Sequence, residues 1–244
     1  MSPIRTERTR VPFEGADISV FTARPDGAPP RATVLMLGAI WSVTEHIEDL
    51  CQRLAREGFG AIAPCLFRGE GIPARNAAPE ALTQAFIDFD DRRCLRDLRH
   101  VARLARAGRF GSTGALVSWG FCLGGRFAHM LPAVCGHLDG AIVFYGRMRF
   151  ERQPIKPFLP IELAGLIEVP YLGHFAEFDD LIPLPDVDEL RTALTERRLR
   201  HDVHVYRGAK HSFFDPTRPE VHDPAASALA WSRSIEFLRT IGAP

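Results

Sequence analysis

The sequence lacks the features that mark several large classes of protein. Its 30 basic and 30 acidic residues cancel to a formal net charge of zero, whereas nucleic-acid-binding proteins usually carry a basic surplus. No apolar run reaches the roughly 18 residues that a membrane helix requires. Cysteine is scarce, with five among 244 residues and no disulfide-framework spacing. These absences exclude fibrous, disordered, membrane-spanning and disulfide-scaffold proteins.

The compartment follows from the same observations. The first ten residues are polar and include an acid, unlike a secretory signal. An odd number of unpaired cysteines is typical of a reducing environment. We therefore expect a cytoplasmic protein.

Metal-binding and nucleotide-binding motifs are also missing. The sequence contains no H-E-x-x-H, no paired C-x-x-C and no G-x-x-x-x-G-K-[ST]. His201 and His204 are three residues apart on an expected strand, so their side chains point to opposite faces. The sequence predicts no metal, no cofactor, no nucleic-acid partner and no membrane association.

What is present is a regular alternation of short apolar runs and longer amphipathic segments. The apolar runs are nearly continuous, as in strands buried on both faces of a parallel sheet; they cover residues 34–37, 61–63, 114–117, 141–145, 170–175 and 202–206. Helical spacing predicts helices over residues 44–56, 90–106, 186–198 and 224–241. Residues 17–21 predict a leading strand or hairpin. This alternation predicts one α/β domain over residues 1–244, with helices on both faces of a mostly parallel sheet.

Two long connections interrupt the alternation, at residues 67–89 and 147–169. Loops of this length are uncommon in compact domains and are often functional. We expect both to cover the site. Four of their arginines are either solvated or able to receive an anionic substrate: Arg68, Arg75, Arg147 and Arg149.

Residues 120–124, Gly-Phe-Cys-Leu-Gly, run from an apolar strand into a helix expected over residues 127–135. This is the nucleophile-elbow pattern G-x-S-x-G with Cys122 in place of serine. The sharp turn leaves no room for side chains two positions before and after the nucleophile, and it aims the Leu123 amide at the forming oxyanion. A helix N-terminus also favours a thiolate. The alternative interpretation is a buried structural cysteine.

A nucleophile of this kind needs an acid and then a histidine later in the chain. His211 begins a loop after a late strand, and Asp179 follows another, so both are expected at strand C-terminal ends with Cys122. Asp180 and Glu177 are rival acids. The structural alternatives are a turn-capping histidine and an aspartate at a helix N-cap.

Three segments together resemble the dienelactone hydrolase family of α/β hydrolases: residues 120–125, 177–183 and 208–213. The resemblance runs roughly from Phe13 to Leu238 and implies the α/β-hydrolase fold. It implies Cys122 as nucleophile, His211 as base and Asp179 as the residue that orients the base. The backbone amides of Ile40 and Leu123 would form the oxyanion hole, although Ile40 could also be plain apolar packing.

The substrate pocket is less readable than the catalytic residues. Trp41, Phe121 and Phe213 are candidates to line it, although large aromatic residues are more often core. The sequence also departs from the family. Ala39 stands where the family has a thiol-activating glutamate, and Asp215 where it has an arginine for the substrate carboxylate. A second substrate-binding arginine and a tyrosine have no match in residues 80–89.

The sequence therefore predicts a cofactor-independent hydrolase of a small-molecule ester or lactone, acting through a cysteine thioester, with a substrate other than the dienelactone. Two alternatives stay open: a catalytically weak hydrolase-fold protein with a binding or regulatory role, and an acyl transferase on the same triad. The oligomeric state is not predicted.

Overall fold

The computed structural model describes residues 3–112 and 114–242, built on an eight-stranded sheet in the order β1-β2-β4-β3-β5-β6-β7-β8. The strands are β1 (Ile4–Phe13), β2 (Ala16–Pro25), β3 (Ala32–Leu37), β4 (Gly60–Pro64), β5 (Ala115–Phe121), β6 (Gly140–Phe144), β7 (Tyr171–Phe178) and β8 (His201–Lys210). β2 pairs antiparallel with β1 and β4, and every pairing from β4 to β8 is parallel. The predicted mostly parallel sheet is confirmed.

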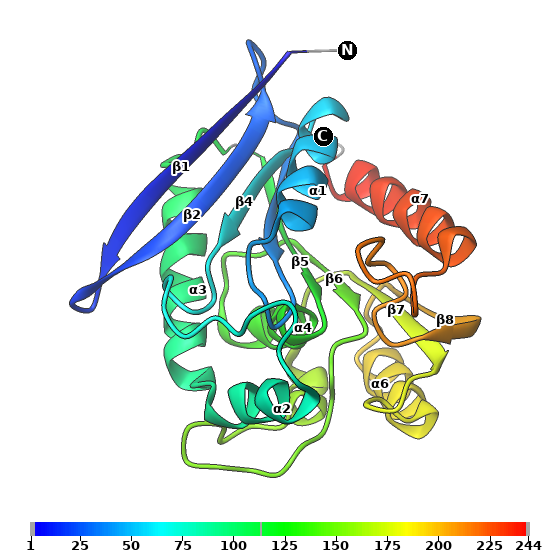
Figure 1. Ribbon diagram of the computed structural model, residues 1–244. Coiled ribbons are helices and arrows are strands. Elements are labelled where there is room, and N and C mark those ends of the chain that lie inside the picture. Colours follow the sequence, from blue (N-terminus) through cyan, green and yellow to red (C-terminus); the bar gives the residue numbers. More distant parts are fainter. Residues whose placement is uncertain (1–2, 113, 243–244) are drawn as a thin grey trace.

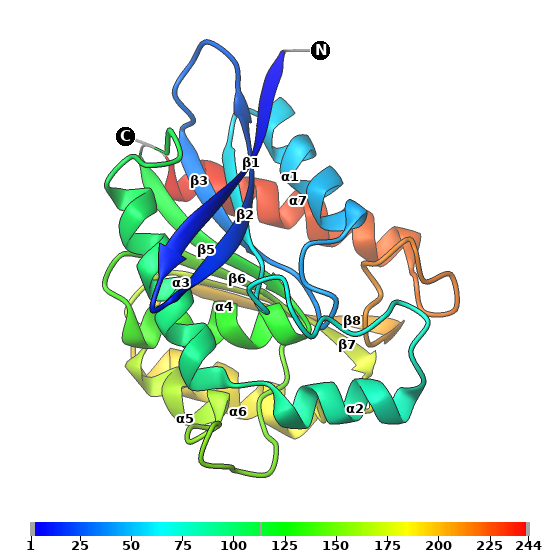
Figure 2. The same ribbon diagram turned by 60° about the vertical axis from the view of Figure 1, so that its left-hand side comes forward.

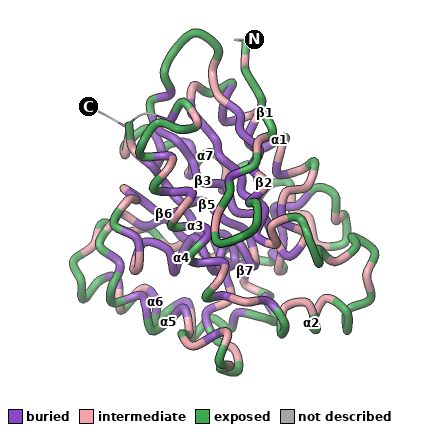
Figure 3. Tube along the Cα trace, turned by 90° about the vertical axis from the view of Figure 1, so that its left-hand side faces the viewer, coloured by how far each residue is buried: buried purple, intermediate pink, exposed green. Residues whose placement is uncertain are grey.

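Helices cover both faces of this sheet (Figures 1 and 2). α1 (Glu45–Arg56) and α7 (Pro224–Ile241) lie on one face, and α3 (Asp91–Arg106), α4 (Leu123–Val134) and α6 (Leu184–Glu196) on the other. Arg53 Cζ lies 4.0 Å from the ring centre of Trp231, and this contact joins α1 to α7. Buried residues follow the sheet and the helix sides that face it (Figure 3).

The helix starts follow directly from capping residues. Thr44 accepts a hydrogen bond from the Ile47 amide and begins α1, and Asp90 accepts one from the Arg93 amide and begins α3. The side chain of Asp223 does the same for α7. These helices begin within one residue of their predicted starts, because the cap and the apolar period agree.

Both long connections contain helices that the sequence analysis did not predict. Residues 67–89 include α2 (Pro79–Asp88), and residues 147–169 include α5 (Pro160–Leu163) and the 3₁₀ helix η1 (Ala164–Leu166). No residue of α2 is fully buried, but Leu82, Ala85 and Phe86 lie on one side of it at helical spacing and pack partly against the core. α4 also starts at Leu123, four residues before the predicted start, directly after the nucleophile elbow.

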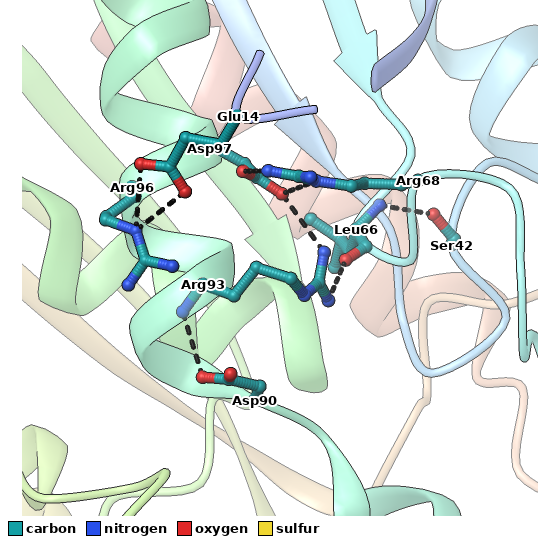
Figure 4. A network of polar contacts seen from close by, with 8 residues as sticks. All are labelled: Glu14, Ser42, Leu66, Arg68, Asp90, Arg93, Arg96 and Asp97. Carbon is teal, nitrogen blue, oxygen red and sulfur yellow. Dashed lines mark hydrogen bonds and ion pairs between the residues drawn. The ribbon is translucent and has the colours of Figure 1, made fainter. Parts of the chain in front are cut away.

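A polar network fixes the chain after β4 (Figure 4). Arg68 donates to Asp97 of α3 at 2.8 Å, and Arg93 donates to the same carboxylate and to the Leu66 carbonyl, both at 3.0 Å. The Leu66 amide donates to the Ser42 hydroxyl at 2.9 Å. The turn after β3 is thereby tied to α3.

None of the helices within residues 3–112 and 114–242 has the length and apolarity to cross a membrane.

Candidate active site

The segment predicted to be a nucleophile elbow lies at the junction of β5 and α4. Cys122 has φ 53° and ψ −111°, a left-handed conformation rare outside glycine, and its amide donates to the Phe144 carbonyl at 3.1 Å. A Cβ on Gly120 would overlap the Gly124 carbonyl, and one on Gly124 would overlap the Leu37 carbonyl. Both glycines are therefore required by close backbone contacts, as the motif predicts.

The structure brings His211 and Asp179 together at the ends of β8 and β7. His211 Nδ1 is 2.8 Å from Asp179 Oδ2, and Asp179 Oδ1 accepts from the Leu181 amide at 2.9 Å. Both carboxylate oxygens are thus occupied, which fixes the orientation of the carboxylate and of the imidazole.

The rival acids lie elsewhere. Asp180 is exposed to solvent, and Glu177 accepts a hydrogen bond from the Gly208 amide. Asp179 is the acid that contacts the imidazole.

The thiol of Cys122 and the imidazole of His211 are electrostatically coupled. Burial alone raises the pKa of the thiol, but the charge of His211 and the hydrogen bond from the Leu123 amide outweigh it and lower the pKa below its usual 9.0. Burial likewise lowers the pKa of His211, but the Cys122 charge and Asp179 raise it above 6.5. The buried Nε2 atom of His211 has no hydrogen-bond partner among the described residues. Both shifts favour a thiolate–imidazolium pair.

A pocket of about 210 Å³ opens onto these groups. Cys122 and His211 line it, and Ile40 and Leu123, the expected oxyanion-hole residues, lie in the same wall. The remaining apolar wall consists of Trp41, Leu82, Phe86 and Leu181. Two of these, Leu82 and Phe86, belong to α2, so the helix missed in the sequence forms part of the wall.

The three aromatic pocket candidates have different positions. Trp41 lines the pocket, with its Nε1 donating to the Ala74 carbonyl at 3.3 Å. Phe121 is 3% exposed and lines a second, smaller cavity, which shares Trp41 and Ser212 with the first. Phe213, contrary to expectation, is fully buried with its ring against Tyr145 and Tyr206. The sequence could not show that it turns inward to the aromatic core.

The second cavity holds the two departures from the family pattern. It has a volume of about 20 Å³, room for one water molecule, and Ala39, His46, Tyr145 and Asp215 line it. Thr217 donates to Asp215 through its amide at 3.0 Å and its hydroxyl at 2.6 Å. Burial raises the pKa of Asp215, but these bonds and nearby cations lower it below its usual 3.8. An aspartate therefore stays charged here.

The four loop arginines also separate by position. Arg147 lines the main pocket, whereas Arg75 lines the second cavity and lies 3.5 Å from Asp215. Arg68 is held by α3, and Arg149 pairs with acidic residues of α6.

Two further arginines, Arg218 and Arg126, line the pocket and were not predicted from the sequence. Arg126 is the nearer of the two to Cys122 along the chain. It follows Cys122 by four residues on α4, a spacing that places both on one side of a helix. Because the expected helix began at residue 127, this signal was not available.

Backbone strain is concentrated around the site. Positive φ angles occur at Ser42 (56°), Cys122 (53°), Tyr145 (38°) and Ser212 (67°). Each of these residues follows β3, β5, β6 or β8 and lines one of the two cavities. Such conformations cost ~1–3 kcal/mol each and cluster at functional sites.

Comparison with known proteins places this geometry in a family. The dienelactone hydrolase family model matches residues 18–242. An Escherichia coli (strain K12) protein named "Putative carboxymethylenebutenolidase" is 35% identical over 239 residues, which are 96% of this chain and 86% of that protein. A Bradyrhizobium protein named "Probable 2-oxo-3-(5-oxofuran-2-ylidene)propanoate lactonase" is 27% identical over 220 residues, covering 90% of this chain and 88% of that protein.

A solved structure agrees with these relatives. The crystal structure of a Klebsiella pneumoniae protein named "Putative Dienelactone Hydrolase" superposes with a TM-score of 0.89 at 31% identity, covering 97% of this chain and 98% of that one. The predicted α/β-hydrolase fold is confirmed. The chain belongs to the dienelactone hydrolase family, whose members hydrolyse esters and lactones, and is an ester or lactone hydrolase.

Proposed function

We propose that the protein hydrolyses a small ester or lactone through a thioester on Cys122, with His211 as base and Asp179 orienting it. The observation that carries this proposal is the 2.8 Å bond from the imidazole to Asp179 beside a pocket-lining thiol whose pKa is lowered. The Asp179 carboxylate holds Nδ1, which leaves Nε2 for proton transfer at the sulfur.

In the first step the Cys122 sulfur attacks the substrate carbonyl carbon. The S–C bond forms, and the carbonyl π pair moves to oxygen, where the amides of Ile40 and Leu123 stabilise the oxyanion. One such donor is typically worth ~3–4 kcal/mol. As the intermediate collapses, the C–O bond breaks and His211 gives its proton to the leaving alkoxide. A lactone opens to a hydroxy-acyl thioester in the same way.

In the second step water attacks the thioester carbonyl. His211 takes one proton from the water, the C–S bond breaks and the acid product leaves. The sulfur departs as the thiolate that the imidazolium stabilises. No cofactor enters either step, and the pocket accommodates a small-molecule substrate.

The lowered thiol pKa accounts for activation without the glutamate that Ala39 replaces. Ordinary thiols are only a few per cent ionised near neutral pH. Here the charge of His211 lowers the pKa of the thiol, so the imidazolium stabilises the thiolate as in cysteine proteases.

Substitution of the nucleophile tests the proposal. Cys122→Ala is expected to abolish hydrolysis of 4-nitrophenyl acetate while the circular dichroism spectrum stays unchanged, and mass spectrometry of the quenched wild-type reaction should find an acetyl group on Cys122. The matched control is Cys65→Ala, which removes another buried cysteine. Undiminished turnover by Cys122→Ala would rule out the mechanism. Iodoacetamide labelling of Cys122 with the pKa of an ordinary free cysteine, together with no ester turnover, would instead support the binding role.

A further inference from the structure

Every exposed residue of α3 is an arginine. The helix buries its apolar side in the core, and its solvent side carries Arg92, Arg96, Arg99, Arg103 and Arg106. Both aspartates of the helix, Asp91 and Asp97, are buried. A helix side that is merely solvated usually alternates charges of both signs, and like charges three or four residues apart repel each other. Five charges of one sign therefore indicate an anionic ligand.

Only two of these five arginines are paired with an acid. Arg96 donates to the carboxylate of Glu14 at 3.1 Å (Figure 4). Arg106 forms an ion pair with Asp139. The other three arginines make no ion pair within residues 3–112 and 114–242. Their charges are left for a partner outside the chain.

Two of the unpaired arginines, Arg99 and Arg103, line a cavity of about 290 Å³. It lies between α3, the end of β1 and the turn after α4 (Figure 2), and its lining residues are Phe13, Arg96, Arg99, His100, Arg103, Cys135, Gly136 and His137. No described lining residue is an aspartate or glutamate. The cavity shares no lining residue with the two cavities at the candidate active site. It is a separate, basic hollow.

The wall of this cavity holds Arg103 in place. The rings of Phe13 and His100 stack with their centres 4.1 Å apart, and Arg103 Nη2 lies 3.3 Å from His100 Nδ1. Burial and the charge of Arg103 lower the pKa of His100 below its usual 6.5, so the neutral ring accepts this hydrogen bond and carries its own proton on Nε2. Arg103 is thus positioned while its remaining N–H groups stay available.

The donors define the chemistry of the ligand. A guanidinium is always charged, and its planar fork of N–H groups matches pairs of phosphate oxygens. Arg99 and Arg103 are four residues apart, which places their Cβ atoms roughly 5–6 Å from each other on one side of the helix. Two forks at this spacing suit an anion with two adjacent charged groups. A cavity of about 290 Å³ is close to the lower end of small-molecule sites.

We propose that the cavity beside α3 binds a small molecule with a diphosphate group, and that Arg99 and Arg103 each hold one of the two phosphates. His100 and His137 line the same cavity and supply further N–H donors. Binding is reversible and forms no covalent bond. The site goes beyond the proposed ester hydrolysis and uses none of its catalytic residues.

Calorimetry with inorganic pyrophosphate tests the site. The wild type and Cys122→Ala should bind pyrophosphate equally, and more tightly than they bind inorganic phosphate at matched ionic strength. Arg99→Ala/Arg103→Ala should weaken binding roughly 10-fold or more, because it removes two hydrogen-bonded charges. Both arginines are exposed, so the double variant should fold. Loss of binding in Cys122→Ala would place pyrophosphate at the candidate active site and overturn the proposal.

Arg10→Ala/Arg207→Ala is the matched control. Both residues are exposed arginines, on β1 and β8, without an ion pair among the described residues, and their removal changes the net charge by the same amount. This variant should bind pyrophosphate within about threefold of the wild type. Pyrophosphate should also raise the Tm of the wild type and the control, but not of Arg99→Ala/Arg103→Ala. Equal losses in the two double variants, or no loss in Arg99→Ala/Arg103→Ala, refute the site.

Two further titrations identify the source of the diphosphate group. Binding of adenosine diphosphate that Arg99→Ala/Arg103→Ala removes would support a diphosphate ester as the ligand, and binding of pyrophosphate alone would support the free anion. A DNA duplex that binds more tightly than pyrophosphate, with equal losses in the two double variants, would show a diffuse basic surface. That result would overturn the small-molecule site.

Discussion

The two walls of the pocket are built differently. The wall at the sheet edge carries Cys122, His211 and Asp179 on the ends of three strands, where backbone contacts and hydrogen bonds fix each side chain. The opposite wall is α2, which has no buried residue and contributes only side chains such as Phe86. Under the proposed function, this difference places the chemistry on the rigid core and the contacts that select the substrate on a less buried cover. The following predictions test this division from the largest effect to the smallest.

The elbow should tolerate no added side chain. A Cβ at position 124 would meet the carbonyl groups of Leu37 and Gly38, so Gly124→Ala should cost ~4–5 kcal/mol, a magnitude that marks disrupted packing. Gly136→Ala is the control, because a Cβ there meets no atom within 4 Å. Urea unfolding of the two variants measures the contrast. Equal stability would contradict the rigidity assigned to the elbow.

The imidazole should depend on its carboxylate. Asp179→Asn keeps the shape but removes the charge that orients and stabilises the imidazolium, so kcat should fall ~10²–10⁴-fold. Asp180→Asn is the neighbouring control, since that residue is exposed, and it should retain full activity. Steady-state hydrolysis of 4-nitrophenyl acetate provides the measurement. The reverse order of effects would assign the acid to Asp180.

The reactivity of the thiol should have a pH dependence set by His211. Only the thiolate reacts, and the pKa of Cys122 is lowered, so its alkylation by iodoacetamide should reach half its maximum below pH 9.0. In His211→Gln burial acts without the imidazolium, so the midpoint should move up by a unit or more. Peptide mass spectrometry follows the labelled residue, and labelling of the buried Cys94 serves as an unfolding control. A midpoint that does not move would show that His211 does not hold the thiolate.

The smallest effect is expected where α2 is attached. Lys156 is 1% exposed, and its Nζ donates to the carbonyls of Ile87 and Phe89 at the end of the helix. Lys156→Met should raise KM severalfold and speed amide exchange in α2. We expect kcat to stay unchanged and the free energy of unfolding to change by no more than ~1 kcal/mol. Hydrogen exchange resolved by peptide, together with ester kinetics, tests both parts. A fall in kcat without a change in KM would mean that α2 supports the catalytic wall.

The same division explains what could be read from the sequence. The strands, the capped helices and the elbow were predictable, because burial on both faces, capping residues and glycine spacing are local signals. The proximity of Cys122, Asp179 and His211 was predictable from these signals, since the carboxyl ends of parallel strands meet at one edge of a sheet. Their catalytic roles remain predictions until the variants above are measured.

Features of the cover were not predictable for a physical reason. α2 has only a short apolar stripe, Leu82, Ala85 and Phe86, and its proline- and alanine-rich surroundings are typical of a loop. Phe213 lies two residues after His211, and no local sequence signal distinguishes a ring that faces the pocket from one that packs on Tyr206. Arg126 was not recognised because the predicted start of α4, at residue 127, lay four residues too late.

The four positive φ angles around the site have a consequence for heat inactivation. Ser42, Cys122, Tyr145 and Ser212 keep their shapes only while neighbouring strands hold them. Warming should therefore release these turns only when the sheet itself melts, and hydrolytic activity should persist up to the main calorimetric transition and disappear with it. Stabilising the sheet would then lengthen the working lifetime of the enzyme.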